Sequence, residues 1–284
     1  MKVKSDTFNL MKIVIFDPKK TFTIEQQKQL SSVGQIVYTK TKDELSVKNA
    51  INLAEGADVI ALGPSVLGGF EKAKERLTQL MESLPNLKGV CLGTTSFGWI
   101  DLEYTKKRKI SVTNVPGYSR ESVAEHTIAM LLGLAKRIFV SDRATQKGKY
   151  EMIQGFELRG KTLGIIGLGS IGMATAELAK GIGMKVIAYT RTPKKMKKGV
   201  IIVNTVDREL VNEKDMAEAL KSGKVDSYAY EGEDLVNTPL AKLENSIGLQ
   251  GFGYYTKEAL ENLYRIWVNN IIATSKGKPQ NRVV

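Results

Sequence analysis

Three glycines spaced as GxGxxG are the residues of this sequence best suited to carry chemistry. Gly167, Gly169 and Gly172 follow the apolar run 162–166 and open a stretch with helical spacing. In such a turn the first glycine permits a tight bend, and the second lets a pyrophosphate approach the backbone. The third lets the helix lie close to the strand. The sequence therefore predicts a dinucleotide site at this turn.

The residues that follow indicate where the cofactor's phosphates bind and which dinucleotide is used. The amides near Ser170 and Ile171 face the phosphates at the positive end of the predicted helix. The next strand ends on Thr190, Arg191 and Thr192, where an NAD site usually has a carboxylate that binds the ribose hydroxyls. A guanidinium at that place can instead hold a 2′-phosphate through two N–H bonds. We therefore predict NADP as the cofactor, with NAD as the alternative.

These residues must be positioned by alternating strands and helices. Apolar, β-rich runs alternate with stretches of helical spacing, which predicts an α/β fold with parallel sheets and helices on their faces. One long helix is expected over 120–143, and a final helix over about 256–273. The predicted strands are 11–17, 34–39, 57–63, 87–93, 110–114, 162–167, 199–205, 224–230 and 245–250.

Composition excludes several other classes of protein. The 284 residues carry a net charge of +12, which fits a lysine-rich solvated surface or an anion site. The basic stretches lack interleaved aromatic residues and have no helix-turn-helix or zinc-finger spacing, so nucleic acid is the minor hypothesis. The single cysteine, Cys91, excludes an internal disulfide and a cysteine-based zinc cluster, and we expect no metal. No membrane-spanning run or signal peptide is expected, and we predict a cytoplasmic protein.

Longer stretches carry a family resemblance. The segments 114–137 (NVPGYSRESVAEHTIAMLLGLAKR), 157–172 (ELRGKTLGIIGLGSIG), 197–225 and 238–260 together resemble the D-2-hydroxyacid dehydrogenases, the family of phosphoglycerate and formate dehydrogenases. The resemblance implies a flavodoxin-like substrate domain and a Rossmann-type doubly wound cofactor domain, with a small 2-hydroxy or 2-oxo acid as substrate. It also implies a homodimer built on the long interdomain helix.

The implied domains are residues 1–113, completed by a C-terminal helix within 255–284, and residues 114–254 for the dinucleotide. The motif VNTVDR (203–208) resembles the family's VNTARG, which makes Thr205 a candidate cofactor-binding residue. Asp207 then stands at the position of the family's catalytic arginine, and Arg208 follows one residue later. Arg208 is our candidate for that cation.

The family's other catalytic groups match only in part. QGFG (250–253) resembles the family's PHIG, so Gly251 stands where the catalytic histidine belongs. The only histidine, His126, lies where the family has one without a catalytic role, and we interpret it as structural. Glu233 in YEGEDL is the candidate for the catalytic glutamate. By strand register Glu231 instead falls where the family has an aspartate near the nicotinamide amide, and surface acids are a third interpretation.

The connection after the strand that ends at Thr190 is short. About eight residues stand where the family has another helix and a central strand. Either the strand 199–205 closes the sheet beside the strand of the glycine turn, or a segment is missing.

Three functions fit these observations. They are an oxidoreductase with altered acid–base groups (Tyr254, Tyr255, Glu233 or a water supplying the proton), a cofactor-binding sensor, and a nucleic-acid-associated protein.

Overall fold

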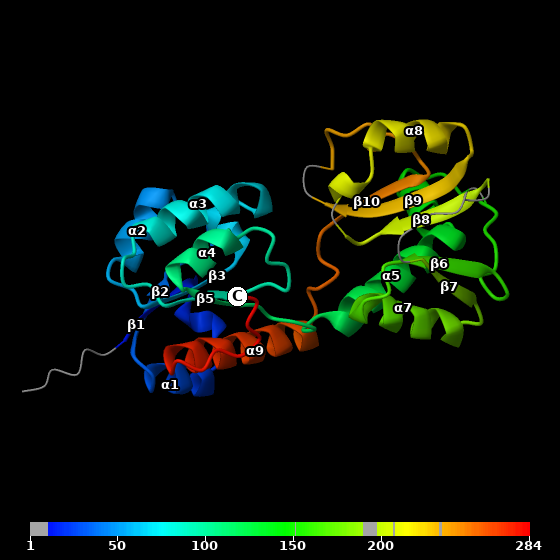
Figure 1. Cartoon of the computed structure of the whole chain (residues 1–284). Coiled ribbons are helices and arrows are strands. Elements are labelled where there is room, and N and C mark those ends of the chain that lie inside the picture. Colours follow the sequence, from blue (N-terminus) through cyan, green and yellow to red (C-terminus); the bar gives the residue numbers. More distant parts are fainter. Residues whose placement is uncertain (1–10, 151, 190–197, 207, 233–234) are drawn as a thin grey trace, which may run out of the picture. The chain divides into compact units, whose positions relative to one another are not determined.

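The structure is a computed structural model, and it describes residues 11–150, 152–189, 198–206, 208–232 and 235–284. The chain divides into two compact units (Figure 1). Unit 1 comprises the residues up to Tyr118 together with Leu260–Val284, and unit 2 comprises Ser119–Ala259. The expected domain boundaries were residues 113 and 255.

The described part of unit 1 contains a five-stranded parallel sheet of order β2-β1-β3-β4-β5, which is the flavodoxin-like strand order. The strands are β1 (Lys12–Pro18), β2 (Gln35–Thr39), β3 (Val59–Leu62), β4 (Gly89–Leu92) and β5 (Ser111–Thr113). The helices are α1 (Ile24–Ser31), α2 (Val47–Ala54), α3 (Phe70–Glu82), α4 (Leu102–Arg108) and α9 (Lys257–Ser275). Short 3₁₀ turns are η1 (Lys19–Thr21) and η2 (Pro64–Leu67).

Strand alternation gives this sheet two apolar cores. Val14 and Phe16 face the cluster formed with α2 and α3, whereas Ile13 and Ile15 face α1 and α9. Neighbouring residues of a strand point to opposite faces, so continuous apolar runs fit a sheet that helices cover on both sides. From α9, the buried Trp267 donates its indole N–H to the carbonyl of Cys91 on β4 at 2.9 Å.

Unit 2 contains two parallel sheets in its described residues, β6-β7 and β10-β9-β8. The strands are β6 (Thr162–Ile166), β7 (Lys185–Tyr189), β8 (Val200–Asn204), β9 (Val225–Gly232) and β10 (Ser246–Gln250). The helices are α5 (Arg120–Ala135), α6 (Ile138–Gln146), α7 (Ser170–Gly181) and α8 (Glu213–Lys221), with a 3₁₀ turn η3 (Arg208–Leu210).

Helix α5 lies against both sheets. Its residues Ile128 and Leu131 share a core with α7, β6 and β7, while Met130 and Leu134 pack on β9 and β10. Helix α8 covers the opposite face of the three-stranded sheet, as Figure 1 shows. The helix that leads into unit 2 is therefore the common support of the glycine turn and of strands β8–β10.

The prediction of one continuous helix over 120–143 is wrong. Helix α5 ends at Ala135, and Arg137 has the left-handed backbone conformation, with φ 57°. The Arg137 guanidinium forms two hydrogen bonds of 3.1 Å with the Asp226 carboxylate and one of 2.9 Å with Ser227 Oγ. A bidentate ion pair at the start of β9 therefore accompanies the break between α5 and α6.

Of the two alternatives for the short connection, closure of the sheet with β8 beside β6 does not occur in the described residues. Strand β6 pairs with β7, and β8 pairs with β9, but the two sheets share no ladder. Strand β7 ends at Tyr189 and β8 begins at Val200, so a short connection joins them. One face of β6-β7 is left open, with Ile166 74% and Ile187 45% exposed.

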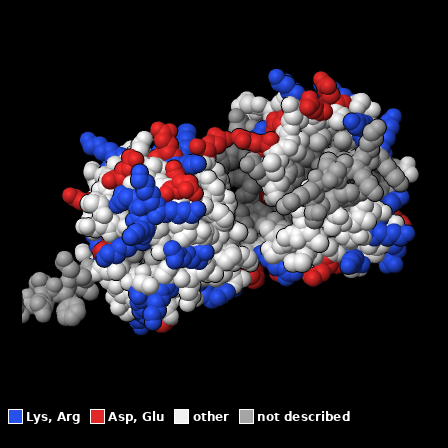
Figure 2. Space-filling model, viewed as in Figure 1, with Lys and Arg blue, Asp and Glu red and all other residues white. Residues whose placement is uncertain are grey.

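The surface is mixed in charge on the side seen in Figure 2. Lys and Arg side chains are scattered over both units, with Asp and Glu among them. This distribution favours the interpretation of the +12 net charge as a solvated surface. None of the helices in the described residues is long and apolar enough to cross a membrane.

Candidate functional site

The glycine turn has the geometry expected of each of its three glycines. Gly167 follows β6 and has φ +91°, a conformation that side chains rarely adopt. A Cβ on Gly172 would lie 2.3 Å from the carbonyl oxygen of Gly167, so only glycine lets α7 approach the turn this closely. A Cβ on Gly169 would meet no described atom within 4 Å. Gly169 therefore borders open space, although its own backbone needs no glycine.

Helix α7 begins directly at this open space. Its N-cap is Gly169, which has no side chain to accept the first amides, and Ser170 and Ile171 are its first two residues. Its first turn contains no acidic residue. From α5, Arg120 donates through Nε to the Ser170 carbonyl at 3.2 Å, which places a cation beside this turn. Amides without a side-chain cap, a positive helix end and room among the described residues for a ligand fit a pyrophosphate.

A second group of polar residues lies at the carboxyl ends of β8, β9 and β10. Thr205 follows β8, and its Oγ1 lies 3.3 Å from Thr127 Oγ1 of α5. Glu231 stands near the end of β9, and its Oε1 accepts the backbone N–H groups of Phe252 at 3.1 Å and Gly253 at 2.9 Å. The residues 251–253, which follow β10, will be called the post-β10 loop.

His126 also belongs to this group. Its Nε2 lies 3.2 Å from Glu231 Oε1, and its ring packs edge-on against Phe252 at a centroid distance of 5.1 Å. Ser122, one turn earlier on α5, donates to the Gly253 carbonyl at 2.5 Å. Sequence reasoning missed both contacts of α5 with the post-β10 loop. Only the position of Ser122 and His126 on one face of a helix could have indicated them.

Arg208 lies in a network on the other side of β9. Its Nε is hydrogen-bonded to Glu213 Oε1, and its guanidinium lies over the Tyr230 ring. Thr238 donates to the other oxygen of Glu213 at 2.6 Å. The hydrogen bond from Arg208 holds the pKa of Glu213 below its ordinary value. Arg208 is the residue that the resemblance suggests for binding a substrate carboxylate. In the structure it is instead paired with the carboxylate of Glu213.

Two buried tyrosines complete this network. The rings of Tyr228 and Tyr230 stack at 5.1 Å with an interplanar angle of 11°. Burial raises the pKa of both phenols, so neither is a base at neutral pH. The proposed proton donors Tyr254 and Tyr255 are 40% and 65% exposed.

Five of the candidate residues lie outside the described residues. They are Thr190, Arg191 and Thr192 at the predicted phosphate site, Asp207, and Glu233. Arg208 lies in the network with Glu213, and the other candidates fall into two further places. Those at the glycine turn are Gly167, Gly169, Ser170, Ile171 and Gly172, and Thr205 and Glu231 are at the carboxyl ends of the other strands.

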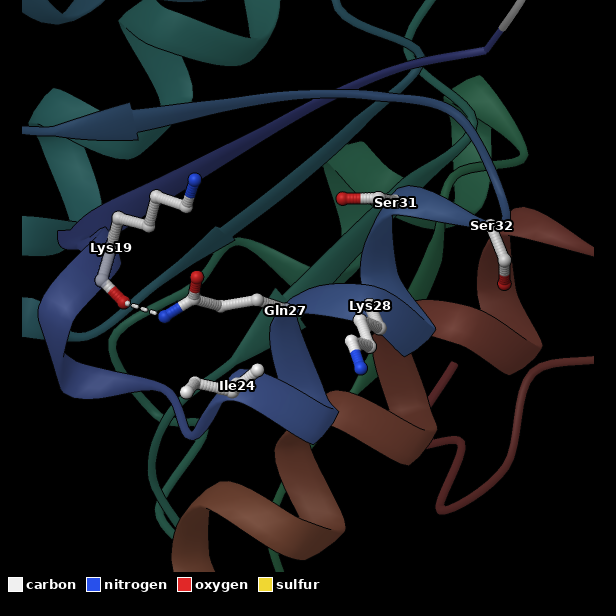
Figure 3. A pocket seen from close by; sticks show the side chains of 6 residues that line it. All are labelled: Lys19, Ile24, Gln27, Lys28, Ser31 and Ser32. Carbon is white, nitrogen blue, oxygen red and sulfur yellow. Dashed lines mark hydrogen bonds between the residues drawn. The ribbon is translucent and has the colours of Figure 1, made fainter.

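Elsewhere the described residues offer little chemistry. A hollow in unit 1 lies beside α1 and is lined by Lys19, Ile24, Gln27, Lys28, Ser31 and Ser32 (Figure 3). The Gln27 amide already donates to the Lys19 carbonyl at 3.2 Å. The hollow contains no carboxylate, histidine or cysteine. No cluster of His, Cys, Asp and Glu suited to a metal ion occurs within the described ranges.

The fold and the glycine turn define a two-unit α/β protein with a dinucleotide-type βαβ motif. The family model for "D-isomer specific 2-hydroxyacid dehydrogenase, catalytic domain" matches residues 13–284, and the chain belongs to this family. A glyoxylate reductase of Thermococcus litoralis is 31% identical to it, over 85% of this chain and 88% of the relative.

Solved structures show the same fold. A glyoxylate reductase from Paecilomyes thermophila superposes with a TM-score of 0.82 at 21% identity, covering 96% of this chain and 98% of that one. An acyclic imino acid reductase in complex with NADPH and D-Arg gives 0.80 at 22% identity, covering 96% and 100%. The predicted family and the two-domain Rossmann-type fold are confirmed.

The alignment with the Thermococcus relative also shows a difference in length. It spans 299 positions, whereas 85% of this 284-residue chain cannot fill so many. The relative therefore contains residues that have no counterpart here. This agrees with a chain shorter than its family pattern.

Proposed function

We propose that the chain is an oxidoreductase that binds a nicotinamide dinucleotide at the glycine turn and acts on a small 2-hydroxy or 2-oxo acid. The observation that carries the proposal is the contrast among the three glycines: a positive φ at Gly167, no room at Gly172 and open space at Gly169. A similar protein named glyoxylate reductase and a neighbour solved with NADPH support it. We also propose a cytoplasmic location, from the single cysteine alone.

NADP is the proposed cofactor, with NAD as the alternative. The argument is the sequence Thr190, Arg191 and Thr192, in which a guanidinium stands where NAD sites have an acid. An acid there would repel a 2′-phosphate, whereas arginine attracts it through charge-assisted hydrogen bonds.

The bound nicotinamide would supply the hydride, and the chain has to hold the reactants and move one proton. The first amides of α7 are suited to the pyrophosphate, and Thr205 and Glu231 stand at the carboxyl ends of the strands that face the second half of such a cofactor. Glu233 remains the candidate for the acid that handles the proton. Arg208 remains the candidate cation for a substrate carboxylate, but it must leave Glu213 to bind one.

A cofactor-binding sensor with little turnover is the second candidate function. Two observations favour it: Gly251 has no side chain at the position of the family's histidine, and Arg208 is paired with Glu213. General acid catalysis contributes about 10²–10⁴-fold, so its loss makes turnover slow. We expect weak or undetectable reduction of glyoxylate, hydroxypyruvate and pyruvate. Rates of about 1–10³ per second would contradict the sensor.

A double variant separates the two functions further. Gly251→His combined with Asp207→Arg should raise any trace activity and leave the dissociation constant of the cofactor nearly unchanged. If it gains nothing, the site is not built for 2-oxo acids and the sensor is favoured.

The cofactor site is tested with two glycine variants of one βα unit. Gly169→Ala adds a methyl group where no described atom stands in the way, so the fold should persist while the pyrophosphate is kept off the backbone. We expect NADPH affinity to fall at least about tenfold, or ~1.4 kcal/mol. The control is Gly181→Ala at the end of α7, where a Cβ likewise meets nothing described and no phosphate is expected. Equal affinities for both variants would contradict the site.

A further inference from the structure

Side chains from α5 and β9 hold three backbone groups of the last two residues of the post-β10 loop. Glu231 Oε1 accepts the N–H groups of Phe252 and Gly253, and Ser122 Oγ donates to the carbonyl of Gly253. One carboxylate oxygen and one hydroxyl thus fix two consecutive residues of a segment that has no ladder of its own in the described residues. A carboxylate bonded to backbone N–H groups makes hydrogen bonds about twice as strong as neutral ones.

His126 supports this carboxylate from the helix side. Its imidazole and the Glu231 carboxylate are only 13% and 12% exposed, and Nε2 lies 3.2 Å from the same oxygen, Oε1. Nε2 makes no aligned hydrogen bond to any described residue, so the pair is a close charge contact when the imidazole is protonated. The edge of the His126 ring also meets Phe252, which places the sole histidine against both the carboxylate and the loop.

The packing around this pair leaves no space at Gly253. A Cβ there would lie 3.0 Å from His126 Cδ2 and 3.3 Å from each carboxylate oxygen of Glu231. Distances of that size are below ordinary van der Waals contact, so the loop backbone, the imidazole and the carboxylate are mutually in contact. These contacts and hydrogen bonds together fix the position of the loop.

The loop lies at the edge of the sheet where a cofactor is expected to bind. Strands β8, β9 and β10 are parallel, so Thr205, Glu231 and the loop gather at the same edge of the sheet. Ligands of doubly wound sheets bind outside the carboxyl ends of the strands, and a dinucleotide spans the two halves of such a sheet. With the pyrophosphate at α7 and one nucleoside over β6-β7, the other nucleoside would lie at the edge formed by β8–β10.

We propose that His126 and Glu231 are positioning residues for the nicotinamide half of the cofactor. They act through the post-β10 loop: the carboxylate holds the loop amides, the imidazole holds the carboxylate, and the loop forms the wall against which that half binds. Glu231 then needs no direct contact with the cofactor. The inference rests on the proposed dinucleotide site and assigns a role to a histidine that the sequence indicated as structural.

The test compares two ligands that differ only at one end. NADPH has the nicotinamide, whereas 2′-phospho-ADP-ribose lacks it and reports the rest of the site. Glu231→Gln removes the charge at constant shape, and His126→Leu removes the imidazole. For each variant we expect NADPH to bind about tenfold more weakly, with a smaller fluorescence enhancement of the bound dihydronicotinamide, while 2′-phospho-ADP-ribose affinity stays within about twofold.

His126→Gln places a polar side chain of similar reach beside the carboxylate and should recover most of the NADPH affinity. Glu218→Gln on α8, an exposed acid of the same unit, is the matched charge control and should change neither affinity. A parallel loss for both ligands would show that the pair supports only the fold and would overturn the proposal. Unchanged affinities for both ligands would overturn it as well. If the wild-type chain binds neither ligand, the proposed function itself fails, which is a separate result.

Discussion

At the residue scale, the sequence predicted what depends on backbone geometry and missed what depends on distant partners. The glycine spacing indicated the turn at Gly167 and the close approach at Gly172, because both follow from local stereochemistry. The environment of Arg208 could not be predicted, because Glu213 reaches it from α8 and Thr238 from the segment before β10. The same holds for the contact between His126 and Glu231.

Two glycines of the post-β10 loop give a matched test of its packing. Gly253→Ala forces the new methyl group against His126 and Glu231, and we expect the free energy of unfolding of unit 2 to fall by about 1–3 kcal/mol. At Gly251 a Cβ meets nothing within 4 Å in the described residues, so Gly251→Ala should leave it nearly unchanged. Chemical denaturation of the two variants measures the difference, and equal effects would show that the loop is not held as described.

The pair of Arg208 and Glu213 predicts a pH dependence of stability. Because the pKa of Glu213 is lowered in the folded protein, its contribution is present above the ordinary glutamate pKa of about 4.3 and is lost as pH falls through the lower folded value. Glu213→Gln should therefore cost about 1.5 kcal/mol at pH 7 and progressively less below about pH 4. Urea denaturation at pH 7 and pH 3.5 tests this, and a cost that persists at pH 3.5 would argue against the ion pair.

At the element scale, apolar runs located the strands well because buried parallel strands are apolar along their whole length. The expected runs 57–63 and 87–93 became β3 (Val59–Leu62) and β4 (Gly89–Leu92), in which every residue is buried. The break between α5 and α6 was not predicted, because it coincides with a tertiary pair between Arg137 and Asp226 that helical periodicity does not contain. The divided sheet of unit 2 was not predicted, and the sequence indicated only that the connection before β8 is short.

The divided sheet predicts unequal stability of the two units. Unit 1 has one sheet covered on both faces, whereas one face of β6-β7 in unit 2 leaves Ile166 and Ile187 exposed. Less apolar burial means less stabilisation, at about 25 cal/mol per Å². Differential scanning calorimetry should show two transitions, with the lower one raised by NADPH because ligand binding stabilises the folded state. A single transition unaffected by cofactor would contradict this account.

At the scale of the whole molecule, we propose a homodimer. Helix α6 has no buried residue, and Ile138 is 54%, Tyr150 85% and Phe156 36% exposed along this part of unit 2. Apolar side chains left open in this way are typical of an interface between subunits. Light scattering at micromolar concentration should give twice the chain mass of 31.3 kDa, and a monomer would contradict the dimer.

The central claim is that unit 2 binds a nicotinamide dinucleotide, and calorimetric titration with NADPH and with NADH at one fixed salt concentration tests it most directly. We predict saturable binding of both, with NADPH tighter because Arg191 replaces the usual acid. Arg191→Asp should shift the preference toward NADH by about 1–3 kcal/mol, the range for a lost hydrogen bond to a charged group. Equal or reversed affinities would refute the choice of NADP, and no binding of either nucleotide would contradict the site itself.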